Sequence, residues 1–280
     1  MSQDPKAPPA SLGIVYNTSM TRPDAALALA ALYAASAKRD ARVNGICITG
    51  SGFDAAIFCD IVARFYTGTA RAPSSNAALP IGFPSDPPGA ANPPMVEPAI
   101  NRKRPDGQPQ YARTIQRLTD TAAPDALLRN AITFSADTAV VLSAPATWLA
   151  RSLALAGTSA LYRQHVKRVV IVEADDLARD APAAKALVAA LPIPAVSVGR
   201  DIGQALTVPV SRVQSAFTRP GPNPVADAVA AAGITQVSLL DLAALHVAIH
   251  PDAGFFSVAN GRLVLDPAQK EACLEALLKI

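Results

Sequence analysis

Apolar runs of strand length recur along the chain and alternate with segments of helical periodicity. The runs lie at Leu12–Tyr16, Val43–Thr49, Leu79–Phe83, Thr138–Ser143, Lys167–Val172 and Ile193–Val198. Runs of this length are typical of strands that are buried on both faces of a sheet. Because they alternate with helical segments, they predict an α/β fold with a mostly parallel, open sheet and helices on both faces.

Proline residues mark the starts of several expected helices, because the first helical turn does not need the missing N–H group. The first of these helices follows a polar turn and starts near Pro23. The further starts are Pro145, Pro182 and the pair Asp266-Pro267. Residues 68–108 differ, because Pro, Gly, Ser and Asn dominate and no helical period is visible. We expect one domain over residues 1–280, with 68–108 as an irregular surface insert or a functional loop.

Composition supports a globular protein and gives no indication of a nucleic-acid or membrane partner. Half of the 280 residues are apolar and 17% are charged, which is enough for a sizeable core and excludes intrinsic disorder. The net charge is +3, and the dense basic cluster Asn101–Pro105 lacks interleaved aromatic residues. We interpret it as a solvated loop and expect no nucleic-acid partner. No run of 18 apolar residues occurs, so no membrane span is expected.

The cysteines and the N-terminus bear on compartment and cofactors. Cys47, Cys59 and Cys273 are widely spaced, and neither a Cys-x-x-Cys pair nor zinc-type spacing of histidines occurs. A disulfide framework is therefore not expected, which favours a reducing, cytoplasmic compartment. The polar N-terminus lacks an apolar signal region, and export through a removed leader is left open. No Gly-x-Gly-x-x-Gly or Walker-type loop is present, so no nucleotide cofactor is expected.

The polar turn after the first strand carries the most specific signal. Its residues Asn17-Thr-Ser-Met-Thr-Arg-Pro-Asp24-Ala resemble the Asp-Thr-Asp-x-Gly-x-Asp-Asp-Ala motif of the inosine/uridine-preferring nucleoside hydrolases. Weaker pieces of resemblance follow in the same order over nearly the whole chain, at Asn44–Gly50, Leu79–Gly82, Val141–Ala150, Lys167–Val172, Asp180–Ala184, Leu191–Gly203 and Leu239–Asp252. The resemblance implies a nucleoside-hydrolase-like fold.

The resemblance also assigns places in a calcium-dependent site. In this family a bound calcium ion activates a water molecule, and a carboxylate takes the proton as the water attacks the ribose carbon. Asp24 and Asp241 match metal-ligating carboxylates, and Thr147 matches a donor of a backbone carbonyl. Ser19 stands at the place of the ligand that also serves as base, and Asn17 replaces a further acid.

Erosion of the motif sets the functional question. Pro23 replaces another acid, so three of the four loop acids are absent, and Leu240 stands where the family often has a histidine. Two carboxylates with carbonyls and waters hold calcium weakly, because affinity follows ligand charge. A serine hydroxyl is not a base near pH 7 without a partner. His246 falls roughly 140° from Asp241 on a helix and is expected to face elsewhere.

We therefore expect calcium binding to be weak or lost and a small-molecule ligand to be retained. The candidate ligand-binding residues are Asn17, Ser19, Thr147, Trp148 and Glu173. Purely structural roles are also open for several of the candidate site residues. Asp24 and Asp241 also suit helix caps, Trp148 also suits a core position, and Glu173 also suits a solvated acidic turn.

Three functions follow from this reading. The first is a protein that binds a ribosyl-like or other small polar ligand and does not hydrolyse nucleosides. The second is an active hydrolase of N-glycosidic bonds with a rebuilt site around Asp24 and Asp241. The third is a structural subunit without a ligand, and a homo-oligomer is compatible with each of the three. The first is favoured, because catalysis by several carboxylates fails steeply when one is removed.

Overall fold

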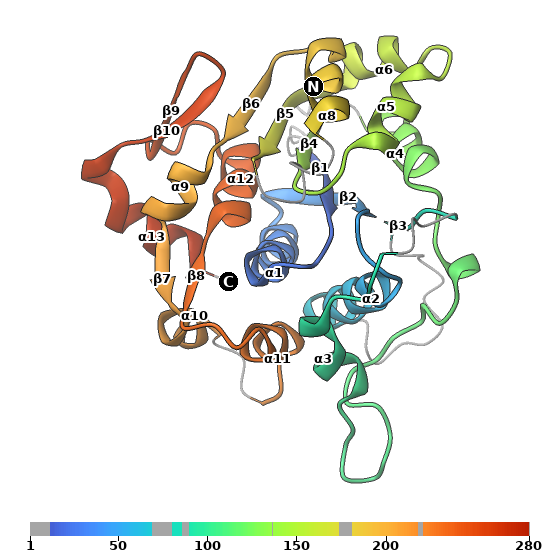
Figure 1. Cartoon of the computed structure of the whole chain (residues 1–280), viewed down its shortest axis with the longest axis vertical. Coiled ribbons are helices and arrows are strands. Elements are labelled where there is room, and N and C mark those ends of the chain that lie inside the picture. The colour runs from blue at the N-terminus through green and yellow to red at the C-terminus, as the bar shows by residue number, and fades with distance from the viewer. Residues whose placement is uncertain are drawn as a thin grey trace, which may run out of the picture.

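The computed structural model describes residues 12–68, 80–85, 90–135, 137–173, 181–217 and 221–279, and it is organised around an eight-stranded sheet (Figure 1). The strand order is β3-β2-β1-β4-β5-β6-β10-β9. The strands are β1 Leu12–Thr18, β2 Ala41–Ile48, β3 Ile81–Gly82, β4 Thr138–Leu142, β5 Val166–Val172, β6 Ala195–Val198, β9 Phe256–Ala259 and β10 Arg262–Leu265. All neighbours pair in parallel except β9 and β10. The predicted α/β fold with a mostly parallel sheet is confirmed.

Helices connect successive strands and cover the sheet. They are α1 Pro23–Lys38, α2 Asp54–Thr67, α3 Glu97–Asn101, α4 Pro124–Thr133, α5 Thr147–Ala154, α6 Thr158–His165, α8 Ala181–Ala190, α9 Arg200–Ala205, α10 Val210–Ala216, α11 Pro224–Ala231, α12 Leu240–Ile249 and α13 Lys270–Leu277. Short 3-10 turns lie at Pro94–Val96, Leu118–Asp120 and Pro267–Gln269. A separate antiparallel pair joins β7 Thr207–Pro209 to β8 Gln236–Ser238.

The two faces of the sheet carry two separate cores, because successive side chains of a strand point to opposite faces. In β1, Ile14 and Tyr16 belong to the larger core, whereas Val15 belongs to the smaller one. Helices α1, α2, α11 and α12 supply the larger core, and α4, α5, α6 and α8 border the smaller one. Helices are thus present on both faces, as the buried strands predict.

The positions predicted from sequence agree with most of these elements. Each apolar run contains or overlaps a strand, and α1 and α8 begin at or beside Pro23 and Pro182. The β9–β10 hairpin was not predicted. Its turn, Asn260-Gly261, has positive φ angles of 51° and 73°, which is the backbone that an Asn-Gly pair favours between two strands. This pair was a readable signal in the sequence.

The expected insert at 68–108 is partly regular where it is described. Residues 69–79 and 86–89 lie outside the described residues, and the rest contains β3, a 3-10 turn and α3. The basic cluster Asn101–Pro105 is exposed and begins a loop that extends from α3 (Figure 1). The chain returns to the domain at Thr114 and Ile115, where the backbone N–H of Ile115 donates to the buried Asp60 carboxylate at 3.0 Å.

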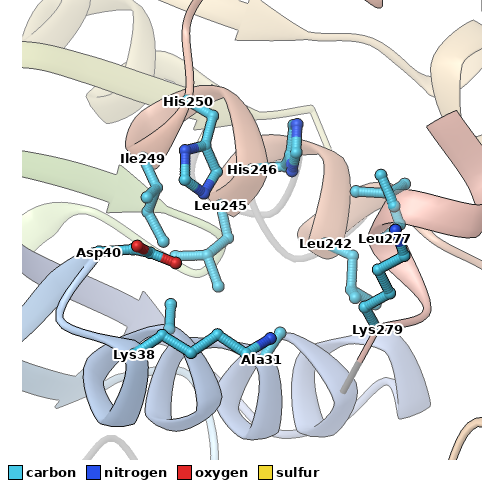
Figure 2. Close-up of a pocket in the computed structure, with 12 residues that line it drawn as sticks. Ala31, Lys38, Asp40, Leu242, Leu245, His246, Ile249, His250, Leu277 and Lys279 are labelled. Carbon is cyan, nitrogen blue, oxygen red and sulfur yellow. The ribbon is translucent and has the colours of Figure 1, made fainter. Parts of the chain in front are cut away.

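Helix α12 is buried along most of its length, and one of its faces borders a hollow of 200 Å³ shared with α1 and α13 (Figure 2). His246 lines this hollow together with Lys38 and Asp40. Burial, followed by the nearby His250, lowers the pKa of His246 to about 4, so its imidazole is neutral at pH 7. His246 thus faces this hollow, in agreement with its expected direction on the helix.

The structure also bears on membrane association and redox state. Among the described helices, none combines the length and the apolar character that a membrane crossing requires. Cys47, Cys59 and Cys273 are buried free thiols, and burial raises the pKa of Cys273 to about 11. Thiols with raised pKa values are poor nucleophiles, so we assign these residues to packing.

Candidate functional site

The turn between β1 and α1 brings the sequence-predicted acids together at the carboxyl ends of the central strands. Asp24 lies in the first turn of α1, and Asp241 lies in the first turn of α12. Helices α1 and α12 pack against each other, and α12 also packs on β4 and β5. The first turns of both helices therefore meet beside the ends of β1 and β4, which is where open α/β sheets bind ligands.

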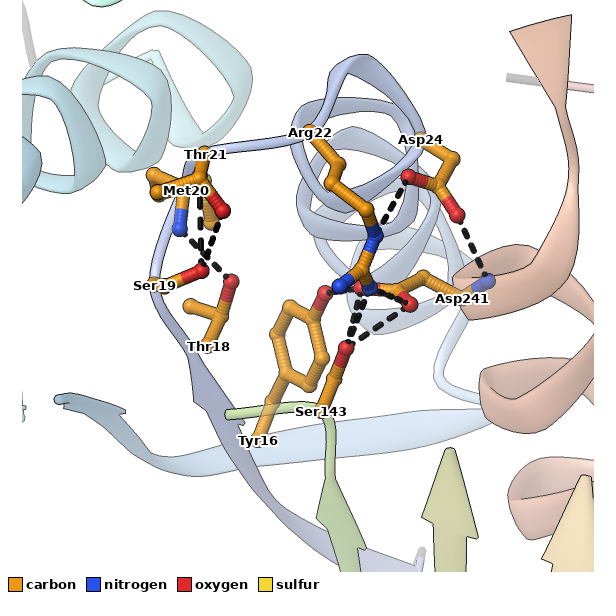
Figure 3. A network of polar contacts seen from close by, with 9 residues as sticks. All are labelled: Tyr16, Thr18, Ser19, Met20, Thr21, Arg22, Asp24, Ser143 and Asp241. Carbon is orange, nitrogen blue, oxygen red and sulfur yellow. Dashed lines mark hydrogen bonds and ion pairs between the residues drawn. The ribbon is translucent and has the colours of Figure 1, made fainter. Parts of the chain in front are cut away.

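Arg22 lies between these two acids (Figure 3). Its Nε donates to Asp24 Oδ1 at 3.3 Å, and its Nη2 forms an ion pair with Asp241 Oδ1. The same Nη2 donates to Ser143 Oγ at 2.7 Å, and the Ser143 hydroxyl lies 2.7 Å from both carboxylate oxygens of Asp241. The guanidinium group of Arg22 thus bridges the two carboxylates.

Tyr16, on strand β1, also contacts Asp241. Its side chain is fully buried on the face of the sheet that α1 and α12 cover, and its hydroxyl donates to Asp241 Oδ2 at 2.6 Å. Burial, followed by the charge of Asp241, raises the pKa of Tyr16 well above its ordinary value. Tyr16 therefore keeps its proton at neutral pH, and its hydroxyl remains a hydrogen-bond donor to Asp241.

Asp24 links the two helices directly. Its Oδ2 accepts a hydrogen bond of 3.1 Å from the backbone N–H of Asp241, one of the N–H groups that the first turn of α12 leaves without a helical partner. The expected capping role is thus met across helices, because Asp24 serves α12 and α1 has no side-chain cap. Burial, followed by the charge of Asp241, raises the pKa of Asp24 to about 6, against the lowering effect of Arg22.

Asn17 and Ser19 form hydrogen bonds with residues other than Asp24 and Asp241. The Asn17 amide donates to Thr49 Oγ1 at 2.9 Å and to the Cys47 carbonyl at 3.2 Å, and this ties the end of β1 to β2. The Ser19 hydroxyl lies 2.7 Å from the Thr21 hydroxyl, away from the Arg22–Asp241 contacts in Figure 3. The residues at the places of the first acid and of the base are therefore hydrogen-bonded within the loop and to β2.

The remaining predicted site residues are placed as follows. Thr147 is exposed at the first position of α5, whereas Trp148 is 5% exposed and packs in the smaller core, as its core interpretation predicts. Glu173 follows β5, and its carboxylate accepts from Arg262 at 2.9 Å. Glu173 also lines a hollow of 240 Å³ with Arg22, Pro23, Asp24, Arg200, Ile234, Val237, Ser238 and Leu240.

The donor set does not fit a calcium ion. Calcium takes six to eight oxygen ligands, mostly carboxylates and carbonyls. Within the described ranges, no group of three or more His, Cys, Asp or Glu side chains is placed to hold a metal. The two carboxylates that do meet, Asp24 and Asp241, already share the Arg22 guanidinium. A cation at this position would have to displace a group that is itself positively charged.

Arg22, Tyr16 and Ser143 were not singled out from the sequence. Ser143 directly follows β4, and the carboxyl ends of parallel strands share one edge of a sheet, so its position was a readable signal. Arg22 lies within the turn that resembles the acidic motif. A basic residue there, where three acids of the motif are replaced, was a signal that the net charge of the turn differs. Tyr16 carried no such signal, because an apolar strand commonly contains a tyrosine.

Comparisons with known proteins identify the fold. Neither a family model nor a curated protein sequence matches the chain. An inosine-uridine preferring nucleoside hydrolase from Bacillus anthracis matches with a TM-score of 0.65 at 12% identity, over 96% of this chain and 99% of that one. The purine-preferring ribonucleoside hydrolase from Gardnerella vaginalis gives 0.59 at 14%, over 95% and 99%.

A third similar structure is the type III effector protein XopQ complexed with adenosine diphosphate ribose. Its TM-score is 0.62 at 15% identity, over 97% of this chain and 93% of that one. At such identities the likeness shows the fold and no more. The chain therefore has a nucleoside-hydrolase-like fold, as the sequence resemblance predicted.

Proposed function

We propose that this protein binds a small, hydroxyl-rich ligand of ribosyl type beside Arg22 and Asp24, and that it does not hydrolyse nucleosides by the calcium-dependent route. The observation that carries this proposal is the Arg22 guanidinium between Asp24 and Asp241. It occupies the oxygens that a metal ion would need. The site then has neither the ion that activates water nor a free carboxylate at the place of Ser19 to take a proton.

The hollow beside this pair supports ligand binding. Its wall combines hydrogen-bond donors such as Arg22 and Arg200 with acceptors such as Glu173 and Asp24. Opposite charges of this kind suit the hydroxyl groups of a sugar, which both donate and accept hydrogen bonds. Ile234, Val237 and Leu240 add an apolar part to the lining. The presence of adenosine diphosphate ribose in the XopQ structure adds a ribosyl compound to the probes.

A second candidate function is an N-glycosidic hydrolase with a rebuilt site, and one observation favours it. The pKa of Asp24 is raised to about 6, which is a useful value for a general base near neutral pH. Hydrolysis of this kind would increase as the pH rises through about 6, and Asp24→Asn would abolish it. The measurement below includes this outcome.

We expect the purified full chain to bind ribose or adenosine diphosphate ribose in titration calorimetry and to release no base from inosine or uridine with calcium. Glu173→Gln should weaken binding about tenfold, because a hydrogen bond to a charged acceptor is worth about 1.5–3 kcal/mol. Glu271→Gln is the matched control, since Glu271 pairs with Arg212 at an exposed position outside the hollow.

Two results would contradict the proposal in different ways. Release of base that depends on calcium, or on Asp24, would establish hydrolysis and remove the non-catalytic function. Absence of binding to ribose, inosine and adenosine diphosphate ribose at millimolar concentration would remove the ribosyl-binding function and favour a structural subunit.

A further inference from the structure

We infer that Arg22 is a built-in cation that takes the structural place of a divalent ion, so that this chain assembles its site without a metal. The inference concerns only whether a divalent ion is needed, and it can be tested without any ribosyl ligand. It predicts that divalent ions leave the native protein unaffected, and that a cation site opens when the guanidinium group is removed.

The contacts of Arg22 are those of a bridging cation. A metal ion that joined Asp24 to Asp241 would use carboxylate oxygens of both residues. The guanidinium contacts Asp24 Oδ1 through Nε and Asp241 Oδ1 through Nη2. It also donates to the Ser143 hydroxyl at 2.7 Å, so three segments distant in the sequence converge on one positive group (Figure 3). A planar guanidinium group can serve several oxygens at once, because its donors form a rigid fork.

Burial makes a compensating positive charge favourable at this position. The side chain of Asp241 is fully buried and that of Asp24 is 5% exposed, whereas that of Arg22 is 26% exposed. Two buried carboxylates raise each other's pKa unless a positive charge compensates them. Arginine supplies this charge at every physiological pH, since its guanidinium group does not lose its proton in proteins.

The composition of the turn agrees with this exchange. Between Asn17 and Asp24 the chain has neutral residues where the resembling motif has three of its four acids, and it has Arg22 in the same turn. Fewer carboxylates need less positive charge, and one guanidinium group beside the two ionised acids compensates one of their two negative charges. A divalent ion in addition to Arg22 would leave it with excess positive charge.

The experiment is a thermal unfolding series of the full chain with added calcium or magnesium at constant ionic strength, together with calcium calorimetry. We expect the Tm of the native protein to be unchanged at millimolar calcium and no calcium binding to be detected. Arg22→Gln should lower the Tm by about 6 °C or more, because it removes the positively charged partner of two buried acids. Calcium at millimolar concentration should restore part of this loss in the variant.

Arg102→Gln is the matched control, because Arg102 pairs with Asp227 at a more exposed position. We expect a smaller loss and no calcium response in this control. Micromolar calcium binding by the native protein would overturn the inference, and this result does not require any variant to fold. A folded Arg22→Gln variant without any response to calcium or magnesium would also overturn it, because Arg22 would then be an ordinary ion pair.

Discussion

Asp241→Ala should lower the free energy of unfolding by about 4 kcal/mol, the largest loss that we expect from one substitution in this protein. The Asp241 carboxylate accepts from Tyr16 at 2.6 Å and from Ser143 at 2.7 Å, and it forms an ion pair with Arg22. Its removal takes the carboxylate acceptor away from the buried Tyr16 hydroxyl and one acidic partner away from Arg22. Chemical denaturation monitored by circular dichroism measures the change.

Asp227→Ala is a suitable control for this prediction. Asp227 has the same kinds of partners, because Tyr111 donates to it at 2.7 Å and Arg102 forms an ion pair with it. Its side chain is 15% exposed and that of Arg102 is 42% exposed, so water and salt screen the pair. We expect a loss of about 1 kcal/mol there. Equal losses of unfolding free energy at Asp227 and Asp241 would show that burial of the Asp241 network does not add to its stabilising effect.

The architecture could be predicted because it depends on patterns that local sequence carries. Strands buried on both faces read as apolar runs, as in β4 and β5, and Pro23 and Pro182 mark helix starts. The β7–β8 pair was not predicted, because each strand has three residues, too few to produce a period. The pairing of Asp24 with Asp241 was predicted through the resemblance rather than through any local pattern.

The chemistry of the site could be predicted only in part, because burial and charge balance depend on residues far apart in the sequence. The loss of acids at Asn17, Ser19 and Pro23 is legible in the sequence. That Arg22 turns inward to the remaining acids is not, since an arginine in a polar turn commonly faces solvent. The inward direction depends on Ser143 and Asp241, which lie 121 and 219 positions away from Arg22 in the chain.

Asp24 should make the stability of this protein depend on pH in the direction opposite to an ordinary ion-paired acid. Its pKa in the folded protein is raised from 3.8 to about 6, mainly because the side chain is buried. The folded state therefore binds the proton more tightly than the unfolded state does. The resulting stabilisation is complete below about pH 4 and is lost as the pH rises through about 6. A difference of this size corresponds to about 3 kcal/mol.

Asp24→Asn removes this titration while it retains a side-chain oxygen for the N–H group of Asp241. The stability of the native protein relative to the variant should therefore fall by about 3 kcal/mol between about pH 4 and pH 7, as measured by urea denaturation across that range. Asp54→Asn provides the control, because the pKa of Asp54 is also raised by burial but this residue is only partly buried. Parallel pH profiles for the native protein and Asp24→Asn would show that Arg22 neutralises Asp24 completely, and the raised pKa would then be wrong.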